Sequence, residues 1–464
     1  MNYILDHTNG FKLLKNSINI DNIKKELTVT PIVKNTYNQK IESYEIFKED
    51  KDYLYVPKFW GLNKYNLTDI IKERNPILSI KFNGQLRDYQ QKIVDTVMPI
   101  ITSKGGGVIS LPCGDGKTCI AIYLFTMLKL KTLVIVHKSF LLDQWKESIE
   151  KFTNAKIGLI RSNIIDIEGK DIVIGMLQSL SMKDYHSSIF EKFDLLIVDE
   201  VHNIATKVFS KALPKINTPY TIGLSATPKR DDGLSKVFYW YLGDMIYQKE
   251  KKKNDSVFVN ILKFNVDEKS KEYNKYKEKK TRTGDINLAL MITNLSELES
   301  RNNMIVEQMY SILQQEPERN ILVLSSRIEQ LHLLKEKTDI KLPNNPSGFY
   351  IGKMKAKELK KSEENQIIYA TYEMVNEGFD LPKLNTLIFA TPRSKIEQAV
   401  GRIMRQQTFD LNPLIVDITD EIGVFKGQWF KRCKFYKNLN YKLKFITENE
   451  PLVKPQKVLG FDDM

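Results

Sequence analysis

Few cysteines, no long apolar run and no internal repeat mark this sequence, and each absence excludes a class of protein. Three cysteines in 464 residues (Cys113, Cys119 and Cys433) cannot form a disulfide framework, and their spacing matches no zinc site. No apolar stretch approaches the ~18 residues needed to span a membrane, and the first residues lack the apolar run of about 7 to 15 residues of a signal peptide. Repeats at solenoid periods are also absent. We therefore expect no membrane partner and a reducing, intracellular location.

The rest of the composition is ordinary except for its charge. Hydrophobic residues make up 42% and charged residues 27%, as in soluble globular proteins. A chain of 464 residues is too long for one compact core, so we expect about two to four domains. The net charge of +13 favours a negatively charged partner such as nucleic acid, although many basic proteins bind none.

Short β-branched runs alternate with amphipathic segments in two separate series, which predicts two α/β lobes with parallel sheets. In the first series, Ser139–Lys151 has helical spacing, and in the second, Ser394–Met404 does. The expected strands are 108–110, 132–136, 171–175, 194–200 and 220–226, then 320–326, 348–352, 366–371, 385–390 and 413–418.

Charge-rich segments divide the chain into four expected parts. Residues 1–80 form a small mixed accessory region, 81–250 the first lobe, 251–420 the second lobe and 421–464 a basic, aromatic, helical tail. The charged segment 248–255 is expected to be the linker between the lobes, and the charged stretch that follows, to residue 284, an elaboration on the second lobe.

The segment LPCGDGKT (111–118) follows a strand and precedes a helix, as a phosphate-binding loop does. Gly114 and Gly116 allow tight turns that aim N–H groups at phosphate, and the helix N-terminus adds its dipole. Lys117 would reach the β- and γ-phosphates, and Thr118 would bind Mg²⁺. Leu111 departs from the general motif, which has glycine there, and a chance glycine turn is the alternative interpretation.

Two acids, Asp199 and Glu200 of DEVH, leave the carboxyl end of an apolar strand, where α/β sheets bind ligands. Asp199 would hold Mg²⁺ and Glu200 would polarise the attacking water. A pair of surface acids is the alternative, but a phosphate loop upstream on the same sheet argues against it. His202 would relay the nucleotide state, and the hydroxyls of SAT (225–227) would bond the DEVH carboxylates across neighbouring strands.

In the second lobe, QAVGRIMR (398–405) places Gln398, Arg402 and Arg405 on one helical face. Two arginines directed at a cleft could supply charge to the γ-phosphate, while a solvated basic helix is the equally weighted alternative. The preceding segment has Gly378 and Asp380 in a turn.

Taken in order, these motifs, together with LRDYQ (86–90), resemble helicase superfamily 2 over roughly residues 80–418, and within it the branch of XPB and phage UvsW. The N-terminal YVPKFWGL (55–62) and the tail are similar to transcript-release helicases of large cytoplasmic DNA viruses. The phosphate loop of the XPB and UvsW branch also reads LPCGxGK, which accounts for Leu111. The resemblance implies two RecA-like lobes with the ATP site between them, ATP and Mg²⁺ as cofactors, and a DNA-contacting loop at RDD (230–232).

The resemblance also implies roles for individual residues. ATP binding would involve Arg87, Gln90, Leu111, Pro112, Cys113, Gly114, Asp115, Gly116, Lys117, Thr118, Gly378 and Asp380. Catalysis would involve Lys117, Glu200, Arg402 and Arg405. The metal ion would be bound by Thr118 and Asp199. Hydrolysis would be coupled to movement of the lobes through His202, Ser225, Thr227 and Gln398. Nucleic acid would contact Lys138, Ser139, Gln144, Gln178, Ser179, Arg230, Ser326, Arg327 and Thr371.

Aromatic residues are frequent in the tail and in the N-terminal region. Trp429, Phe430, Cys433, Tyr436 and Leu439 recur at helical spacing, which favours a helix packed on the second lobe over a base-stacking surface. For the same reason we expect Trp60 and its neighbours to belong to a core.

The sequence therefore predicts an ATP-dependent translocase or helicase acting on DNA, in viral transcription or repair, with RNA polymerase or other transcription proteins as further partners. In a viral setting it would act in the host cytoplasm and be carried in the virion. An RNA helicase is the second hypothesis. A nucleotide-gated module that binds nucleic acid or a polymerase without sustained turnover is the third, and the complete catalytic set argues against it.

Overall fold

The computed structural model describes residues 3–6, 10–17, 19–32, 42–67, 78–112, 114–230, 232–249, 254–376, 379, 381–404 and 411–446. The chain forms two compact units, Met1–Glu250 and Lys251–Met464, and each is described by itself. Among the described residues, no helix is both long and apolar enough to cross a membrane.

The first unit is built on an eight-stranded sheet of order β10-β9-β11-β8-β12-β13-β7-β14 within its described residues. All of its strand pairs are parallel except the β9–β10 hairpin. Its strands are β7 (Gly106–Ser110), β8 (Thr132–Val136), β9 (Ile157–Arg161), β10 (Ile164–Asp166), β11 (Ile172–Met176), β12 (Leu195–Val198), β13 (Tyr220–Ser225) and β14 (Met245–Gln248).

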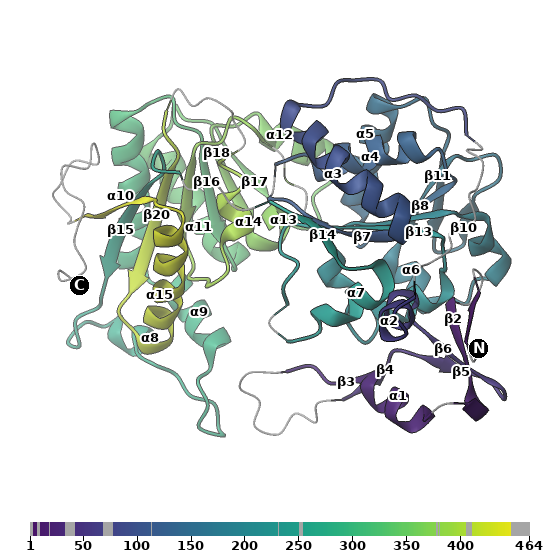
Figure 1. The fold of residues 1–464 in the computed structure, drawn as a ribbon. Helices are drawn as coiled ribbons and strands as arrows, with labels where there is room; N and C mark the ends of the chain where they lie inside the picture. The colour runs from purple at the N-terminus through teal and green to yellow at the C-terminus, as the bar shows by residue number, and fades with distance from the viewer. Residues whose placement is uncertain are drawn as a thin grey trace. The chain divides into compact units, whose positions relative to one another are not determined.

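Helices cover both faces of this sheet (Figure 1). One face carries α3 (Asp88–Lys104), α4 (Lys117–Leu128) and α5 (Ser139–Phe152). The other carries α6 (Leu177–Met182) and α7 (Ser235–Leu242). Strands β7, β8 and β11 are buried at every position because both faces are covered, which explains why they read as unbroken apolar runs.

A small N-terminal region packs on the first unit's sheet through α2 (Lys58–Lys64), which contacts α7. Its antiparallel sheet has the order β1-β2-β6-β5, from β1 (Tyr3–Asp6), β2 (Gly10–Leu14), β5 (Lys48–Glu49) and β6 (Tyr53–Val56). Helix α1 (Ile20–Glu26) and the pair β3 (Thr28–Val29) and β4 (Tyr44–Glu45) complete it. Trp60 lies in its core at 3% exposure, as the sequence predicted.

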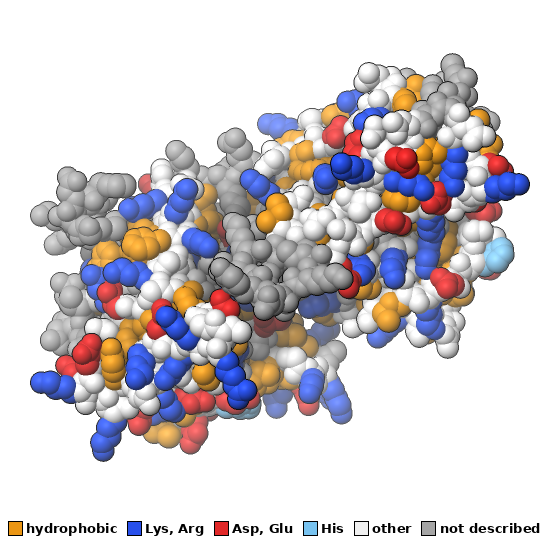
Figure 2. All heavy atoms as spheres, turned by 90° about the horizontal axis from the view of Figure 1, so that it is seen from below, with side chains coloured by type: hydrophobic (Ala, Val, Ile, Leu, Met, Phe, Trp, Pro, Cys, Tyr) orange, Lys and Arg blue, Asp and Glu red, His pale blue; other side chains and the backbone are white. Residues whose placement is uncertain are grey.

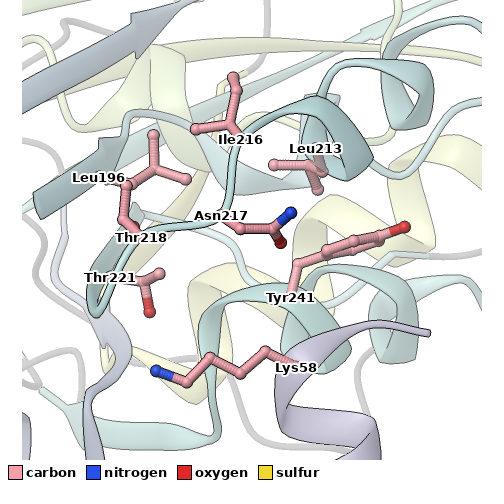
Figure 3. A pocket seen from close by; sticks show the side chains of 8 residues that line it. All are labelled: Lys58, Leu196, Leu213, Ile216, Asn217, Thr218, Thr221 and Tyr241. Atoms are coloured by element: carbon pink, nitrogen blue, oxygen red, sulfur yellow. The ribbon is translucent and has the colours of Figure 1, made fainter. Parts of the chain in front are cut away.

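One buried lysine joins this region to the sheet. Figure 3 shows Lys58 extending from α2 beneath Asn217 and Thr221, along a small pocket. Its amino group donates to the carbonyl of Pro219 at 2.8 Å. The pocket has a volume of about 10 Å³, the space of a single water molecule, and is too small to bind a larger ligand.

The second unit is an all-parallel sheet of order β17-β18-β16-β19-β20-β15-β21 in its described part. Its strands are β15 (Phe258–Phe264), β16 (Ile321–Ser325), β17 (Ser347–Tyr350), β18 (Ile367–Thr371), β19 (Thr386–Phe389), β20 (Leu414–Asp420) and β21 (Lys442–Ile446). Its helices are α8 (Tyr273–Tyr276), α9 (Leu288–Ser296), α10 (Glu299–Gln315), α11 (Ile328–Lys341), α12 (Ala356–Glu363), α13 (Tyr372–Asn376), α14 (Glu397–Val400) and α15 (Gly423–Asn438).

The α/β fold with two parallel sheets confirms the sequence-based prediction. The stretch expected to be a charged elaboration contains β15, which lies inside the sheet between β20 and β21. The tail forms α15 and β21, and Trp429, Cys433 and Tyr436 are buried as predicted, whereas Phe430 is 55% exposed.

Positive charge is not gathered in one block on the face seen from below. Figure 2 shows Lys and Arg side chains interspersed there with Asp and Glu. The net charge of +13 therefore does not by itself locate a binding surface on that face, and the ends of the strands are the more informative place to look for a site.

Candidate functional site

The loop between β7 and α4 contains the predicted phosphate-binding residues. Gly114 and Gly116 have left-handed backbones, with φ of 87° and 76°, which glycine adopts at little cost. A Cβ at Gly116 would lie 2.3 Å from Gln90 Nε2, so a larger residue would have to displace the Gln90 side chain as well as adopt a strained backbone. Helix α4 begins at Lys117, whose amino group donates to the Leu111 carbonyl at 3.3 Å. Such a glycine loop leading into a helix N-terminus is the geometry that binds phosphate; Pro112 and Thr118 flank it, and Cys113 lies outside the described residues.

Side chains from outside the loop hold Asp115 in place. The Tyr89 hydroxyl and Gln90 Nε2 donate to the Asp115 carbonyl at 3.3 and 3.4 Å. Lys249 pairs with the Asp115 carboxylate at 2.6 Å and lies 4.3 Å from the centre of the Tyr89 ring. Arg87 donates to the Tyr89 hydroxyl at 3.3 Å. Arg87 and Gln90 thus lie beside the loop. Lys249 falls in the segment 248–255 that the sequence predicts as a linker, and no sequence pattern indicates its contact with Asp115.

Asp199 and Glu200 follow β12 at the same edge of the sheet, since β12 and β7 both flank β13. Asp199 is buried at 9% exposure, and burial, followed by the charge of Glu200, raises the pKa of its carboxyl. Its Oδ2 accepts the indole N–H of Trp145 at 2.9 Å. A bound cation would relieve this buried charge, and a carboxylate together with the Thr118 hydroxyl is a donor set that suits Mg²⁺.

Glu200 has a left-handed backbone, with φ of 49° and ψ of 60°. For a residue with a side chain this costs on the order of 1–3 kcal/mol and is found mainly at functional sites. The Glu200 carboxylate lies 3.4 Å from His202 Nδ1.

His202 joins two strand ends. Its Nδ1 lies 3.5 Å from the Ser225 hydroxyl, so the structure places His202, and not a carboxylate, beside Ser225; Thr227 contributes its backbone N–H, which donates to Ser225 Oγ at 3.1 Å. Burial, then the charges of His137 and Arg230, lowers the pKa of His202 to about 4. His202 is therefore neutral near pH 7.

Arg230, which the family resemblance predicts to contact DNA, has bonding partners within its own unit. Its Nε donates to Asp232 Oδ1 at 2.9 Å, its Nη2 pairs with Asp232 Oδ2, and its Nη1 donates to the His202 carbonyl. The guanidinium is thus neutralised by Asp232 and faces the DEVH segment.

Candidate nucleic-acid contacts of the first unit gather at two neighbouring strand ends. Lys138 and Ser139 begin α5 directly after β8, and Gln144 lies further along α5. Gln178 and Ser179 lie on α6 directly after β11, which pairs with β8. Ser179 Oγ also accepts the backbone N–H of Ser162 at 2.9 Å, which adds the β9–β10 turn to this edge.

The candidate contacts of the second unit are partly engaged within it. Arg327 donates to Thr293 Oγ1 at 2.9 Å, and to the carbonyls of Ala289 at 2.9 Å and Ser326 at 3.0 Å. It therefore faces α9 in this structure, and its contact with a nucleic-acid backbone remains a prediction. Ser326 follows β16, and Thr371, at the end of the neighbouring β18, is buried at 8% exposure.

Arg402 differs from its expected place on a helix from Ser394 to Met404. Helix α14 spans only Glu397–Val400, so Gln398 is helical and Arg402 lies beyond its end. Arg402 is 5% exposed, and its Nη1 donates to the Phe379 carbonyl at 2.6 Å. Gly378, Asp380 and Arg405 lie outside the described residues.

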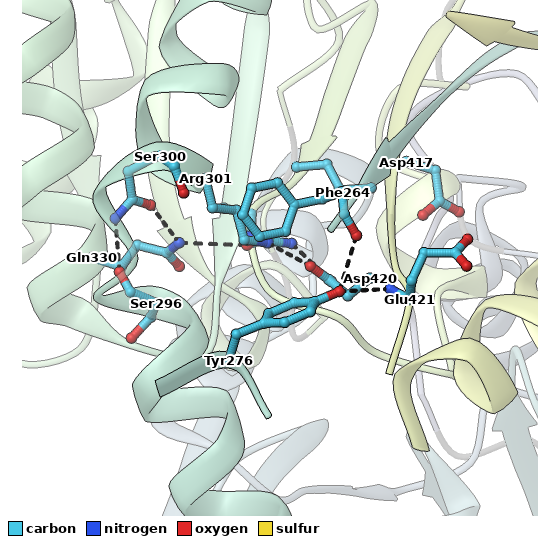
Figure 4. Close-up of polar contacts among 12 residues, drawn as sticks. Phe264, Tyr276, Ser296, Ser300, Arg301, Gln330, Asp417, Asp420 and Glu421 are labelled. Atoms are coloured by element: carbon cyan, nitrogen blue, oxygen red, sulfur yellow. Dashed lines mark hydrogen bonds and ion pairs between the residues drawn. The ribbon is translucent and has the colours of Figure 1, made fainter. Parts of the chain in front are cut away.

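Two buried ion pairs hold the segment that leads to α14. Figure 4 shows Arg301 directed at Asp420; their closest contact is 2.7 Å and both are fully buried. Arg301 also donates to the Ala390 carbonyl, and Arg432, paired with Asp417, donates to that of Arg393. The sequence did not reveal these pairs, because the members of each lie on different elements of the fold.

The chain is similar to several known proteins. Residues 83–230 match the family model described as type III restriction enzyme, res subunit. A candidate ATP-dependent RNA helicase of Acanthamoeba polyphaga mimivirus is 36% identical over 95% of this chain and 86% of its own length. The DNA 3'-5' translocase XPB2 of Sulfurisphaera tokodaii is 26% identical over 78% of this chain and 89% of its own length.

Among solved structures, the Saccharomyces cerevisiae protein Dbp5, bound to RNA and a nucleotide analogue, is 12% identical with a TM-score of 0.53. The match covers 76% of this chain and 89% of that one. At this identity the likeness concerns the fold alone.

Proposed function

The chain belongs to the superfamily 2 helicases, together with helicases of large DNA viruses, and from this membership we propose that it is an ATP-driven translocase acting on DNA. The family hydrolyses ATP to act on nucleic acid. The choice of DNA, the residues involved and the biological process are the parts that we propose.

The observation that carries the proposal is the convergence of three motifs at one sheet edge. Lys117 follows β7, Asp199 and Glu200 follow β12, and Ser225 ends β13, which lies between those strands. Main-chain bonding joins the phosphate loop to Ser225, whose carbonyl accepts the Leu111 N–H at 3.0 Å. Ligands of α/β sheets bind at such an edge.

Each residue has a proposed part in hydrolysis. The 111–118 loop and Lys117 bind the phosphates, and Thr118 and Asp199 hold Mg²⁺, which neutralises charge on the transferred phosphoryl group. Glu200 orients the attacking water, and Arg405 supplies further positive charge. Arg402, bonded to the Phe379 carbonyl, holds that residue in place.

DNA is proposed because DEVH differs from the motif of DEAD-box RNA helicases and because the XPB2 relative is a DNA translocase. An RNA helicase is the alternative, supported by the name of the mimivirus relative. Viral transcription or repair is the proposed process, with RNA polymerase as a proposed partner.

ATP hydrolysis measured with single-stranded DNA, duplex DNA and RNA tests the choice. All reactions are run at one salt concentration, because phosphate contacts weaken steeply with ionic strength. Greater stimulation by DNA supports the proposal. Equal or greater stimulation by RNA favours the RNA helicase, and no stimulation by any of them favours the nucleotide-gated binding module.

A further inference from the structure

Trp145 occupies a position between the nucleotide site and the proposed nucleic-acid contacts. It is 1% exposed and lies on α5, a helix of 14 residues. Its indole N–H donates to Asp199 Oδ2 at 2.9 Å. Lys138 and Ser139, at the start of the same helix, lie about two turns away. One rigid element therefore connects the two groups of residues.

The carboxylate of Asp199 depends on this contact for its orientation. Its other oxygen, Oδ1, accepts the Glu200 N–H at 3.0 Å, so the carboxylate has a donor on each oxygen. Because Asp199 is buried at 9% exposure, the loss of one donor is not fully replaced by water. An indole is a donor only and an ionised carboxylate an acceptor only, so the bond holds the carboxylate with one oxygen directed at α5.

The packing around α5 allows a displacement at the start of this helix to reach Asp199. Trp145, Leu142 and Ile149 belong to the core between α5 and the sheet, and such a core moves as a unit because it is close-packed. Strand β8, which leads into α5, pairs with β12, which leads into Asp199. A change at the start of α5 therefore reaches Asp199 through both the backbone and the indole.

We propose that Trp145 is a positioning residue that orients Asp199 for the metal-bound nucleotide and makes ATP hydrolysis depend on nucleic acid bound at the start of α5. This inference rests on the proposed function. It adds a residue that neither the sequence motifs nor the family resemblance had assigned. Trp145 touches no substrate and acts through Asp199.

Substitution of Trp145 by Phe keeps a buried aromatic ring and removes only the donor. We expect Trp145→Phe to retain ATP binding and to lose about tenfold in nucleic-acid-stimulated hydrolysis, the size expected for a hydrogen bond to a charged group. The Mg²⁺ concentration for half-maximal activity should rise, which a purely structural defect would not cause. Trp240→Phe, on α7 of the same unit, is the matched control and should leave both quantities unchanged.

A second readout does not depend on activity. The four tryptophans are labelled with 5-fluorotryptophan, and the fluorine resonance of Trp145 is identified by its absence in Trp145→Phe. We expect this resonance to shift when an oligonucleotide binds without nucleotide, and again when Mg²⁺ and a non-hydrolysable ATP analogue are added. If Trp145→Phe does not fold, Phe variants of the other three tryptophans, Trp60, Trp240 and Trp429, assign their resonances and the wild-type spectrum still decides.

The outcomes separate this inference from the proposed function. If the wild type binds an oligonucleotide by anisotropy and is stimulated by it, but the Trp145 resonance and the stimulation ratio of Trp145→Phe are unchanged, the role of Trp145 is refuted. If no nucleic acid stimulates the wild type, the proposed function itself fails.

Discussion

Arg432 on α15 and Asp417 on β20 form a two-point ion pair that is shielded from water, with side-chain exposures of 1% and 0%. Arg432 Nη2 lies 2.7 Å from Asp417 Oδ1, and Nε lies 2.9 Å from Oδ2. The Tyr436 hydroxyl donates to the same carboxylate at 2.8 Å. The C-terminal helix is thereby bonded to the strand that precedes it and, through the Arg393 carbonyl, to the segment before α14.

Replacing Arg432 by Met should destabilise the second unit by about 3–5 kcal/mol, because Asp417 would remain buried without its partner. Urea denaturation followed by circular dichroism measures this loss. Lys434→Met, at an exposed position of the same helix, is the control. A loss within about 0.5 kcal/mol of the control, the usual range for surface substitutions, would contradict the ion pair as described.

Two substitutions separate the proposed roles at the phosphate site. Lys117→Ala should abolish hydrolysis while oligonucleotide binding survives, because Lys117 is proposed to contact the phosphates of ATP and not the nucleic acid. Glu200→Gln should keep binding of ATP with Mg²⁺ but stop turnover, since Asp199 and Thr118 remain while the water loses its orienting carboxylate. Equilibrium binding of a fluorescent ATP analogue, with hydrolysis assayed in parallel, checks both. Loss of ATP affinity in Glu200→Gln would count against its assignment.

The stability of the first unit should fall in mild acid, and His202 should contribute to this. Its pKa is about 6.5 when unfolded and is lowered to about 4 in the fold. Below pH 6.5 the unfolded chain therefore binds a proton that folded His202 does not. The resulting loss of folding stability is absent above pH 6.5 and grows as the pH falls towards 4. Denaturation at pH 7 and pH 5 should show a smaller difference for His202→Gln than for the wild type; an equal difference would show that His202 is not protected from protonation.

The two arginines that follow α14 in the sequence should behave differently. Arg402 is buried and bonded to the Phe379 carbonyl, so Arg402→Ala should lower thermal stability as well as activity. Arg405→Ala should leave the melting temperature unchanged and lower kcat by roughly 10²-fold or more, since charge aimed at a transferring phosphoryl group is worth ~10³–10⁵ in related NTPases. Differential scanning fluorimetry and single-turnover hydrolysis compare them. Equal stability losses in both variants would remove the distinction.

Contiguous patterns in the sequence were sufficient to predict most of the sheet. Strands such as β8 and β16 are short, β-branched and buried on both faces, so their composition identifies them without knowledge of their neighbours. Strand β15 was missed because the charged segments on both sides of it dominate the local composition. Helix α14 was predicted too long because the apolar residues after it, such as Ile403, are buried without being helical.

The residues of the candidate site also fall into two groups, those that the sequence predicts and those that it does not. Lys117, Asp199 and Glu200 belong to contiguous motifs, and the structure brings their strand ends together. Trp145, Lys249 and Asp417 act through partners that are distant in sequence, and a single sequence contains no signal for such pairs. The contact between Arg327 and Thr293 is likewise set by the fold.

The most direct test of the account is the rate of ATP hydrolysis by the full chain, with and without single-stranded DNA, for the wild type and for Lys117→Ala. We predict slow hydrolysis by the wild type alone, an increase of at least about tenfold with DNA at matched salt, and no hydrolysis by Lys117→Ala under either condition. Hydrolysis by Lys117→Ala at the wild-type rate, or a wild-type rate that no nucleic acid changes, would contradict it.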